Sequence, residues 1–187
     1  MGLMQLLRGV ALHKPAGYVC SRARDVPEAR LVHDLLPAEW ARRRPGLEVC
    51  GRLDKEATGL VLLSQDGQLA AAAIARGHAR VYEVETEKDI AAETEALFAA
   101  GTLRLRGEAT PLLPARLERL GPRRARVEVR EGRYHQVRRM FEATDNRLTA
   151  IARVAVAGVA LGDLGPGQYR LLTEEELASL SRPRPRT

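Results

Sequence analysis

The sequence predicts one α+β domain, built on a mixed, mostly antiparallel sheet flanked by helices. Three observations favour this class. A length of 187 residues suits a single domain. Strand and helix patterns intermix without the regular alternation of a doubly wound parallel fold. Two alternating segments flank Gly121-Pro122, a turn signal that predicts an antiparallel hairpin. We expect the domain to span residues 1–181 and the arginine- and proline-rich tail at 182–187 to be disordered.

The first quarter of the chain is predicted to hold a strand, a turn, a helix and a loop. Residues 9–14 alternate in polarity, which predicts a short strand, and Pro15-Ala16-Gly17 predicts a turn after it. Residues 27–36 begin with proline and carry recurring apolar side chains, which predicts a short helix. The arginines of residues 42–46 predict a basic loop.

The middle of the chain is predicted to alternate between strands and helices. Residues 59–64 form a continuous apolar run bounded by polar residues, as expected for a fully buried strand. An Asp-Gly pair opens a predicted helix over residues 66–75. Residues 81–86 alternate, so we predict a strand with Tyr82 facing inward. Residues 90–100 are rich in alanine and are predicted to be helical.

The last third of the chain is predicted to contain a hairpin, two helices and further strands. Residues 113–120 and 124–130 form the two arms of the predicted hairpin. Residues 133–144 have helical periodicity, and residues 147–161 are rich in strand-forming residues. Thr173, with a glutamate three positions later, predicts the capping box of a final helix.

The charge of the chain favours an RNA partner without deciding the matter. The formal net charge is +6, and only Lys14, Lys55 and Lys88 of the 30 basic residues are lysine, which leaves 27 arginines. Arginine grips phosphate with two hydrogen bonds and stacks on bases, so an arginine surplus suits RNA. A GC-rich genome that favours arginine codons would produce the same surplus.

Several classes of protein are excluded or disfavoured by composition. No apolar run approaches the roughly 20 residues that span a membrane, and the first ten residues lack the features of a signal peptide. We therefore expect a cytoplasmic protein without membrane association. Cys20 and Cys50 are the only cysteines and are not in a metal-binding spacing, so we predict neither a metal site nor a disulfide.

The first candidate site is residues 51–60, a polar, glycine-bounded loop that leads directly into the predicted buried strand. Loops held by a rigid core element often carry catalytic groups, and Asp54 is the candidate in this one. An aspartate in such a loop more commonly forms a turn or caps a helix. The spacing alone does not decide between these roles.

The second candidate site is the strand-turn-helix stretch at residues 129–140. A helical wheel places Arg138 at the edge of the buried stripe, where it can pair with a buried acid, and points Arg139 towards solvent or phosphate. The alternative is a surface helix whose arginines lie over core side chains. His135 and Gln136 fall outside the stripe and could support the loop or touch RNA. The stripe consists of Tyr134, Val137, Met140, Phe141 and Thr144.

These stretches resemble the RsuA-like branch of the pseudouridine synthases, whose hallmark is a loop that opens with Gly-Arg-Leu-Asp and closes with Gly-Leu. The similarity runs in order through nearly the whole chain, from about Val10 to Leu180, and chance agreement of five ordered motifs is very improbable. The motifs are Lys14 to Ser21, Gly51 to Leu60, Tyr82 to Val84, Glu131 to Met140, and Leu161 to Glu176.

The resemblance implies an RNA pseudouridine synthase, an isomerase that needs no cofactor. Asp54 matches the essential aspartate, Tyr82 the tyrosine that stacks on the target base and assists proton removal from C5, and Arg138 the basic residue that pairs with the aspartate. The carboxylate would attack C1′ or remove a sugar proton to give a glycal, and both routes stay open. Contacts with RNA or substrate are expected from Arg52, Leu53, Thr58, Arg133, His135, Gln136 and Arg139.

Within the branch, the motifs are most similar to enzymes that act on uridine 516 of 16S ribosomal RNA. Many relatives begin with an S4 RNA-binding domain, which we expect to be missing here, so RNA targeting would rely on the arginines of this domain, on a partner or on folded rRNA. A 23S rRNA enzyme of the same branch and a non-catalytic RNA-binding ribosome-assembly factor remain alternatives. We expect a monomer whose partner is ribosomal RNA, free or in an assembling subunit.

Overall fold

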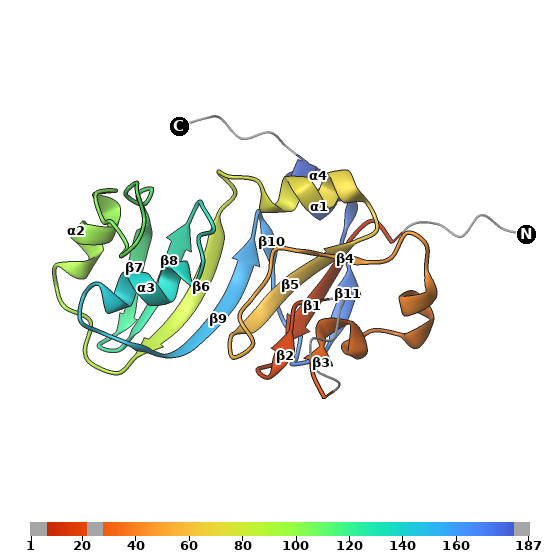
Figure 1. Cartoon of the computed structure of the whole chain (residues 1–187), viewed down its shortest axis with the longest axis horizontal. Helices are drawn as coiled ribbons and strands as arrows, with labels where there is room; N and C mark the ends of the chain where they lie inside the picture. Colours follow the sequence, from red (N-terminus) through yellow and green to blue (C-terminus); the bar gives the residue numbers. More distant parts are fainter. Residues whose placement is uncertain (1–6, 22–27, 182–187) are drawn as a thin grey trace, which may run out of the picture.

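A computed structural model describes residues 7–21 and 28–181, and within them nine strands form one sheet. The strands are β1 Val10–Lys14, β4 Glu48–Cys50, β5 Thr58–Ser64, β6 Arg80–Thr86, β7 Arg116–Gly121, β8 Arg124–Val129, β9 Leu148–Val156, β10 Val159–Ala160 and β11 Tyr169–Leu171. The sheet has the order β11-β1-β5-β9-β6-β8-β7, with β4 beside β5 and β10 beside β9 (Figure 1). Only β5 and β9 pair in parallel among these strands, so the predicted mixed, mostly antiparallel sheet is confirmed.

The helices are short and lie on both faces of the sheet. They are α1 Gly67–Ile74, α2 Thr94–Ala99, α3 Gln136–Glu142 and α4 Glu174–Ser181, with 3-10 helices at Val32–Leu35 and Ala38–Arg42. Figure 1 shows α1 and α4 together at the top of the view, near its middle, and α2 and α3 towards the left end. The longest of the described helices, α1 and α4, have eight residues each, too few to cross a membrane.

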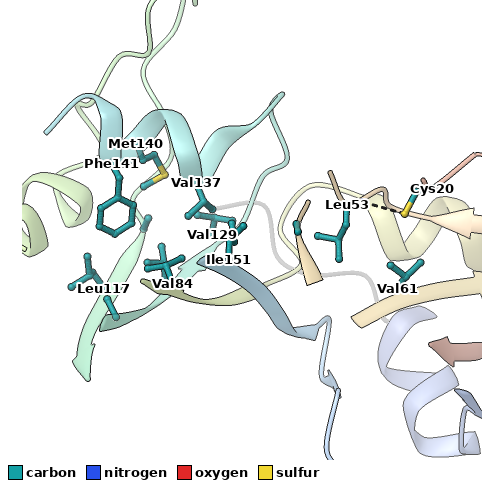
Figure 2. Packing of buried hydrophobic residues seen from close by; sticks show 14 of the residues in the cluster. Cys20, Leu53, Val61, Val84, Leu117, Val129, Val137, Met140, Phe141 and Ile151 are labelled. Carbon is teal, nitrogen blue, oxygen red and sulfur yellow. Dashed lines mark hydrogen bonds between the residues drawn. The ribbon is translucent and has the colours of Figure 1, made fainter. Parts of the chain in front are cut away.

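Strand β5 separates two hydrophobic cores, because its alternate residues point to opposite faces. Leu60 and Leu62 pack with residues of α1 and α4. Val61 and Leu63 belong to the larger cluster, which also contains residues of α2 and α3. Figure 2 shows part of this larger cluster, with Phe141 of α3 among its side chains. The predicted fully buried strand is therefore confirmed, and its α3 face is the one that bears on the candidate site.

Most of the predicted elements are present at their predicted positions. The strands at residues 9–14, 59–64 and 81–86 correspond to β1, β5 and β6, and the predicted hairpin is formed by β7 and β8. The predicted helix at residues 66–75 is α1, and the Asp66 side chain caps it by accepting hydrogen bonds from the amides of Gln68 and Leu69. The tail from residue 182 onward lies outside the described residues.

The helices predicted over residues 27–36 and 90–100 are shorter than expected. Pro27 lies outside the described residues, and the segment after it is extended at β3 Arg30–Leu31, which pairs in parallel with β2 Tyr18–Val19. Only a single 3-10 turn follows β3, so the prediction of a helix over residues 27–36 was largely wrong. The helix predicted over residues 90–100 begins only at Thr94, and the Ile90 amide before it bonds to the Pro122 carbonyl in the hairpin turn.

The helix predicted over residues 133–144 is reduced to α3, which begins at Gln136. His135, just before it, has left-handed backbone angles, φ 47° and ψ 34°, which interrupt a regular helix. Val137 and Phe141 are buried as the wheel predicted. Tyr134 is not: it precedes the helix and is 74% exposed, so placing it in the buried stripe was wrong.

The predicted capping box of the last helix is present. The Glu176 amide donates to the Thr173 hydroxyl (3.2 Å), and the Thr173 amide donates to the Glu176 carboxylate (2.9 Å). We expect Thr173→Ala to lower the free energy of unfolding by about 1 kcal/mol, because one amide of the first turn of α4 loses its acceptor. Chemical denaturation measures this, with Thr102→Ala at an exposed loop position as the control. Equal stability of both variants would contradict the assignment.

Candidate active site

Asp54 lies in the loop between β4 and β5 and faces residues at the start of α3. Its Oδ1 is 3.3 Å from His135 Nε2, and its Oδ2 is 3.5 Å from Arg138 Nε. The three side chains are each about one-third exposed. Arg138 thus lies beside Asp54, as expected from its place at the edge of the buried stripe of the helix. The carboxylate is held between two potential donors and stays open to a ligand.

The Asp54 loop is fastened to the α3 face of the sheet. Leu53 and Ala57 are both buried in the larger core cluster. The Leu53 amide contacts Cys20 Sγ at 3.4 Å, a bond drawn in Figure 2. The Ala57 amide donates to the Asp54 carbonyl at 3.1 Å, which closes a turn within the loop. The backbone around Asp54 is therefore fixed by packing and by hydrogen bonds.

Lys14, at the end of β1, binds the C-terminal half of this loop. Its side chain is fully buried, and its ammonium donates to the carbonyls of Pro15 (2.9 Å), Lys55 (2.9 Å) and Ala57 (2.6 Å). Burial lowers the pKa of Lys14, while the acids Glu56 and Asp54 act in the opposite direction. A buried ammonium needs such partners, and here they are the backbone of the loop that carries Asp54.

Arg153, on β9, binds the N-terminal half of the loop. It is 2% exposed, and its guanidinium donates to the carbonyls of Gly51 (2.9 Å), Arg52 (3.3 Å) and Leu60 (2.9 Å). Arg153 and Lys14 therefore hold the loop from both sides through carbonyl groups. Neither cation forms its bonds with the Asp54 carboxylate, which is left to His135 and Arg138.

Gly59 lets the loop approach β9 closely. It pairs with Arg153 in the short parallel contact of β5 and β9 and has φ +107°, a conformation that side chains rarely adopt. A Cβ at this position would lie 2.2 Å from the Arg153 carbonyl oxygen. The glycine of the loop motif is thus required by the junction that holds the loop.

Strand register places Tyr82 on the face of the sheet that carries the Asp54 loop. It pairs with Arg153 across β6 and β9, and Arg153 pairs with Gly59 on its other side. Residues directly opposite in neighbouring strands point to the same face, so Tyr82 shares the face of Arg153 and of the Asp54 loop. Its side chain is half-buried against the larger core, in agreement with the predicted inward orientation.

The other predicted contact residues divide into accessible and buried ones. Arg52 is exposed, and Thr58 and His135 are partly exposed, so all three are accessible. Arg52 and Thr58 lie in or next to the Asp54 loop, and His135 contacts Asp54 in space. Leu53 and Gln136 are buried, which corrects the expectation that they contact RNA. Gln136 instead accepts a hydrogen bond from the Arg133 amide at 3.0 Å and so supports the turn before α3.

Arg133 and Arg139 are engaged by the protein itself. Arg133 binds Glu131 (3.1 Å) and Glu108 (3.3 Å), and Arg139 binds Glu108 (2.9 Å) and the Arg106 carbonyl (2.7 Å). The hydrogen bond from Arg139 holds the pKa of Glu108 below its usual value. The prediction that Arg139 points away into solvent was wrong, because this pair of arginines anchors the segment around Glu108 against α3.

Sequence reasoning missed the part that Lys14 and Arg153 play in the site. Each continues an inward-facing row of its strand, Lys14 after Leu12 and Arg153 after Ile151. A charged residue at such a position is rarely buried without partners. That pattern is a signal that could have identified both residues as anchors of a polar loop.

Comparisons with known proteins assign this site to a family. Residues 9–143 match the family model described as RNA pseudouridylate synthase. The chain is 41% identical over 174 residues to ribosomal small subunit pseudouridine synthase A of Escherichia coli K12, covering 90% of this chain and 72% of the relative. It is 44% identical over 172 residues to the protein of the same name from Pseudomonas aeruginosa, with the same coverage.

A solved structure supports the same assignment at the level of the fold. The crystal structure of a pseudouridylate synthase matches with a TM-score of 0.85 and 35% sequence identity. The match covers 92% of this chain and 73% of that one. The sheet and helices described above are therefore the fold of that enzyme.

Proposed function

Because the chain belongs to the RNA pseudouridylate synthase family, in its RsuA-like branch, we propose that it isomerises one uridine of 16S ribosomal RNA, of the uridine 516 type. That the chain is an RNA pseudouridine synthase follows from the family and from its similarity to named enzymes. The observation that supports catalysis at this site is Asp54, held open at the surface between His135 and Arg138 on a loop anchored by two buried cations.

The reaction suits a carboxylate on a fixed loop. The N1–C1′ bond of uridine breaks, the uracil turns, and a C5–C1′ bond forms, after which C5 loses its proton and N1 takes one up. No atom is gained or lost overall, so the chemistry needs no cofactor. Asp54 would attack C1′ or remove a sugar proton, and its negative charge would stabilise the positive charge that develops on the sugar. Both routes require the carboxylate to be charged and positioned.

The neighbouring residues have distinct proposed roles. Arg138 and His135 orient the Asp54 carboxylate, and the positive charge of Arg138 lies beside its negative charge. Tyr82 stacks on the uracil once the base has left its helix, which recovers part of the free energy of unstacking. Arg52 and Thr58 contact the RNA backbone. This role for Tyr82 is supported by its strand register with Arg153.

The small ribosomal subunit is favoured by the names of the similar proteins, which refer to that subunit. A 23S rRNA substrate and a non-catalytic assembly factor are the competing functions. We further propose that the protein acts as a monomer in the cytoplasm, where ribosomal RNA is assembled into subunits. The many arginines of the chain would supply the phosphate contacts.

The test is to map pseudouridine in 16S and 23S rRNA of cells that have the gene, lack it, or carry it again on a plasmid. Loss of one 16S site on deletion and its return on complementation is the expected result. A change confined to 23S rRNA would overturn the proposed substrate. Unchanged pseudouridine in both RNAs, with the protein still bound to rRNA, would overturn the proposed activity in favour of the assembly factor.

Removal of the Arg138 charge should slow the reaction. We expect Arg138→Met to lower kcat by about 10- to 150-fold, because a hydrogen bond or ion pair to a charged group contributes roughly 1.5–3 kcal/mol. Arg138→Lys should restore part of the rate, since it keeps the charge. Tritium release from RNA labelled at uracil C5 reports each turnover. Equal rates for Arg138→Met and the unaltered protein would exclude a role for this charge.

A further inference from the structure

We propose that Tyr134, stacked on His135, forms a platform for the base of a nucleotide next to the target uridine. The inference rests on the proposed function and adds to it a second base-binding position, separate from the one proposed for Tyr82. The platform consists of the two rings of Tyr134 and His135, and its ligand is a single-stranded RNA base.

The exposure of Tyr134 has no explanation in packing. At 74% it has the highest exposed fraction among the large apolar side chains in the described part of the chain. Burial of a large apolar side chain contributes roughly 1.5–3 kcal/mol to stability, and this ring forgoes most of that contribution. A large exposed aromatic ring beside a proposed RNA site is what a base-stacking surface requires.

The ring of Tyr134 is nevertheless held in one orientation. It stacks on the His135 imidazole, with ring centroids 3.7 Å apart and an angle of 18° between the ring planes. Stacking covers one face of the tyrosine ring with the imidazole. The backbone is held too, because Arg139 Nη1 donates to the Tyr134 carbonyl at 3.1 Å and the Arg139 amide donates to the His135 carbonyl at 3.0 Å.

The local backbone is strained in favour of this arrangement. His135 adopts left-handed angles that cost a residue with a Cβ roughly 1–3 kcal/mol. This conformation directs the imidazole towards Asp54 while its face carries Tyr134. The same strained conformation of His135 therefore provides both the contact with the Asp54 carboxylate and the aromatic stack with Tyr134.

The position of the stack identifies its ligand. His135 Nε2 is 3.3 Å from Asp54 Oδ1, so the aromatic surface begins at the proposed catalytic carboxylate. When the target uridine leaves its stack to reach Asp54, the adjacent base loses a stacking partner. Tyr134 lies one imidazole ring away from the carboxylate and can replace that partner. Stacking on an aromatic side chain contributes roughly 1–3 kcal/mol per base.

The test measures binding of a short RNA that contains the modified site to the Asp54→Asn variant, which prevents turnover. Adding Tyr134→Leu should raise Kd by about 5- to 150-fold, the equivalent of 1–3 kcal/mol. Tyr134→Phe keeps the ring and should change Kd by no more than about twofold. Because Tyr134 is exposed, neither change should alter the thermal unfolding temperature by more than a few degrees.

Abasic RNAs then identify the nucleotide. When the base at the contacted position is removed, Tyr134→Leu should have no further effect on Kd. When a base at another position is removed, the losses of affinity from base removal and from Tyr134→Leu should add. The inference is overturned if Tyr134→Leu leaves Kd unchanged, or if Tyr134→Phe loses as much affinity as Tyr134→Leu. It is also overturned if the losses of affinity from Tyr134→Leu and from base removal add at every neighbouring position, or if they fail to add only at the target uridine itself. Failure of the unaltered protein to form pseudouridine in this RNA would instead overturn the proposed function.

Discussion

Replacement of Asp54 by asparagine is expected to abolish pseudouridine formation, with a rate at least roughly 10⁴-fold below that of the unaltered protein, as when a catalytic nucleophile is removed. Asparagine has nearly the same shape and can still lie against His135 and Arg138. It has no negative charge, so it can neither attack C1′ nor remove a sugar proton. Single-turnover tritium release from RNA labelled at uracil C5 measures the effect.

A neighbouring acid in the same loop provides the control. Glu56 is exposed two residues further on, and Glu56→Gln removes the same charge without touching the proposed chemistry. We expect this variant to keep its rate within about threefold, because exposed charges are screened by solvent. A residual rate of several per cent in Asp54→Asn would remove Asp54 from its proposed role.

RNA binding should survive the loss of catalysis. Asp54→Asn removes a negative charge from a surface that meets phosphate, so its Kd for rRNA should be unchanged or lower. Filter binding at several salt concentrations tests this. An inactive variant that also fails to bind would mean that the loop had lost its structure, and unfolding measurements would then show a lower stability than that of Glu56→Gln.

The sequence predicted the pair of residues at the centre of this site, Asp54 and Arg138. It did not predict that Lys14 and Arg153 anchor the Asp54 loop. Asp54 and Arg138 lie on two motifs far apart in the chain, and the structure brings their side chains within 3.5 Å. The helical wheel succeeded for Arg138 because residues from Gln136 onward are helical. It failed for Tyr134 because a left-handed residue, His135, separates that tyrosine from the helix. A single backbone conformation of this kind leaves no periodic signal.

Charged partners distant in sequence were also beyond prediction. Sequence analysis assigned Arg133 and Arg139 to contacts with solvent or phosphate. Their partner Glu108 lies 25 and 31 positions earlier in the chain, so no local pattern indicates the pairing. A short apolar-alternating strand does not reveal which loop carbonyls its last lysine will reach. Such pairings depend on the tertiary fold, whereas the turn at Gly121-Pro122 and the helix start at Asp66-Gly67 depend on neighbours in sequence and were predicted correctly.

The second large effect is expected from Lys14, the fully buried cation under the Asp54 loop. Lys14→Met keeps the length of the side chain but leaves the carbonyls of Pro15 and Ala57 without their ammonium donor. The Lys55 carbonyl keeps a hydrogen bond from the Gly17 amide (2.8 Å). Each carbonyl left without a partner costs about 1–3 kcal/mol, so the two together should lower the free energy of unfolding by about 2–6 kcal/mol.

Lys55 makes this prediction testable against a matched variant. It lies in the same loop, next to Asp54, but is exposed, so Lys55→Met should change stability by no more than about 0.5 kcal/mol. Thermal unfolding should place Lys14→Met roughly 4–24 °C below Lys55→Met, from the usual 2–4 °C per kcal/mol for a chain of this size. In the fraction that remains folded, kcat should fall as well, because the backbone of Lys55 and Ala57 no longer positions Asp54. Equal unfolding temperatures for the two variants would mean that the buried ammonium does not hold the loop, and the anchoring of Asp54 would then rest on Arg153 and on the packing of Leu53 and Ala57.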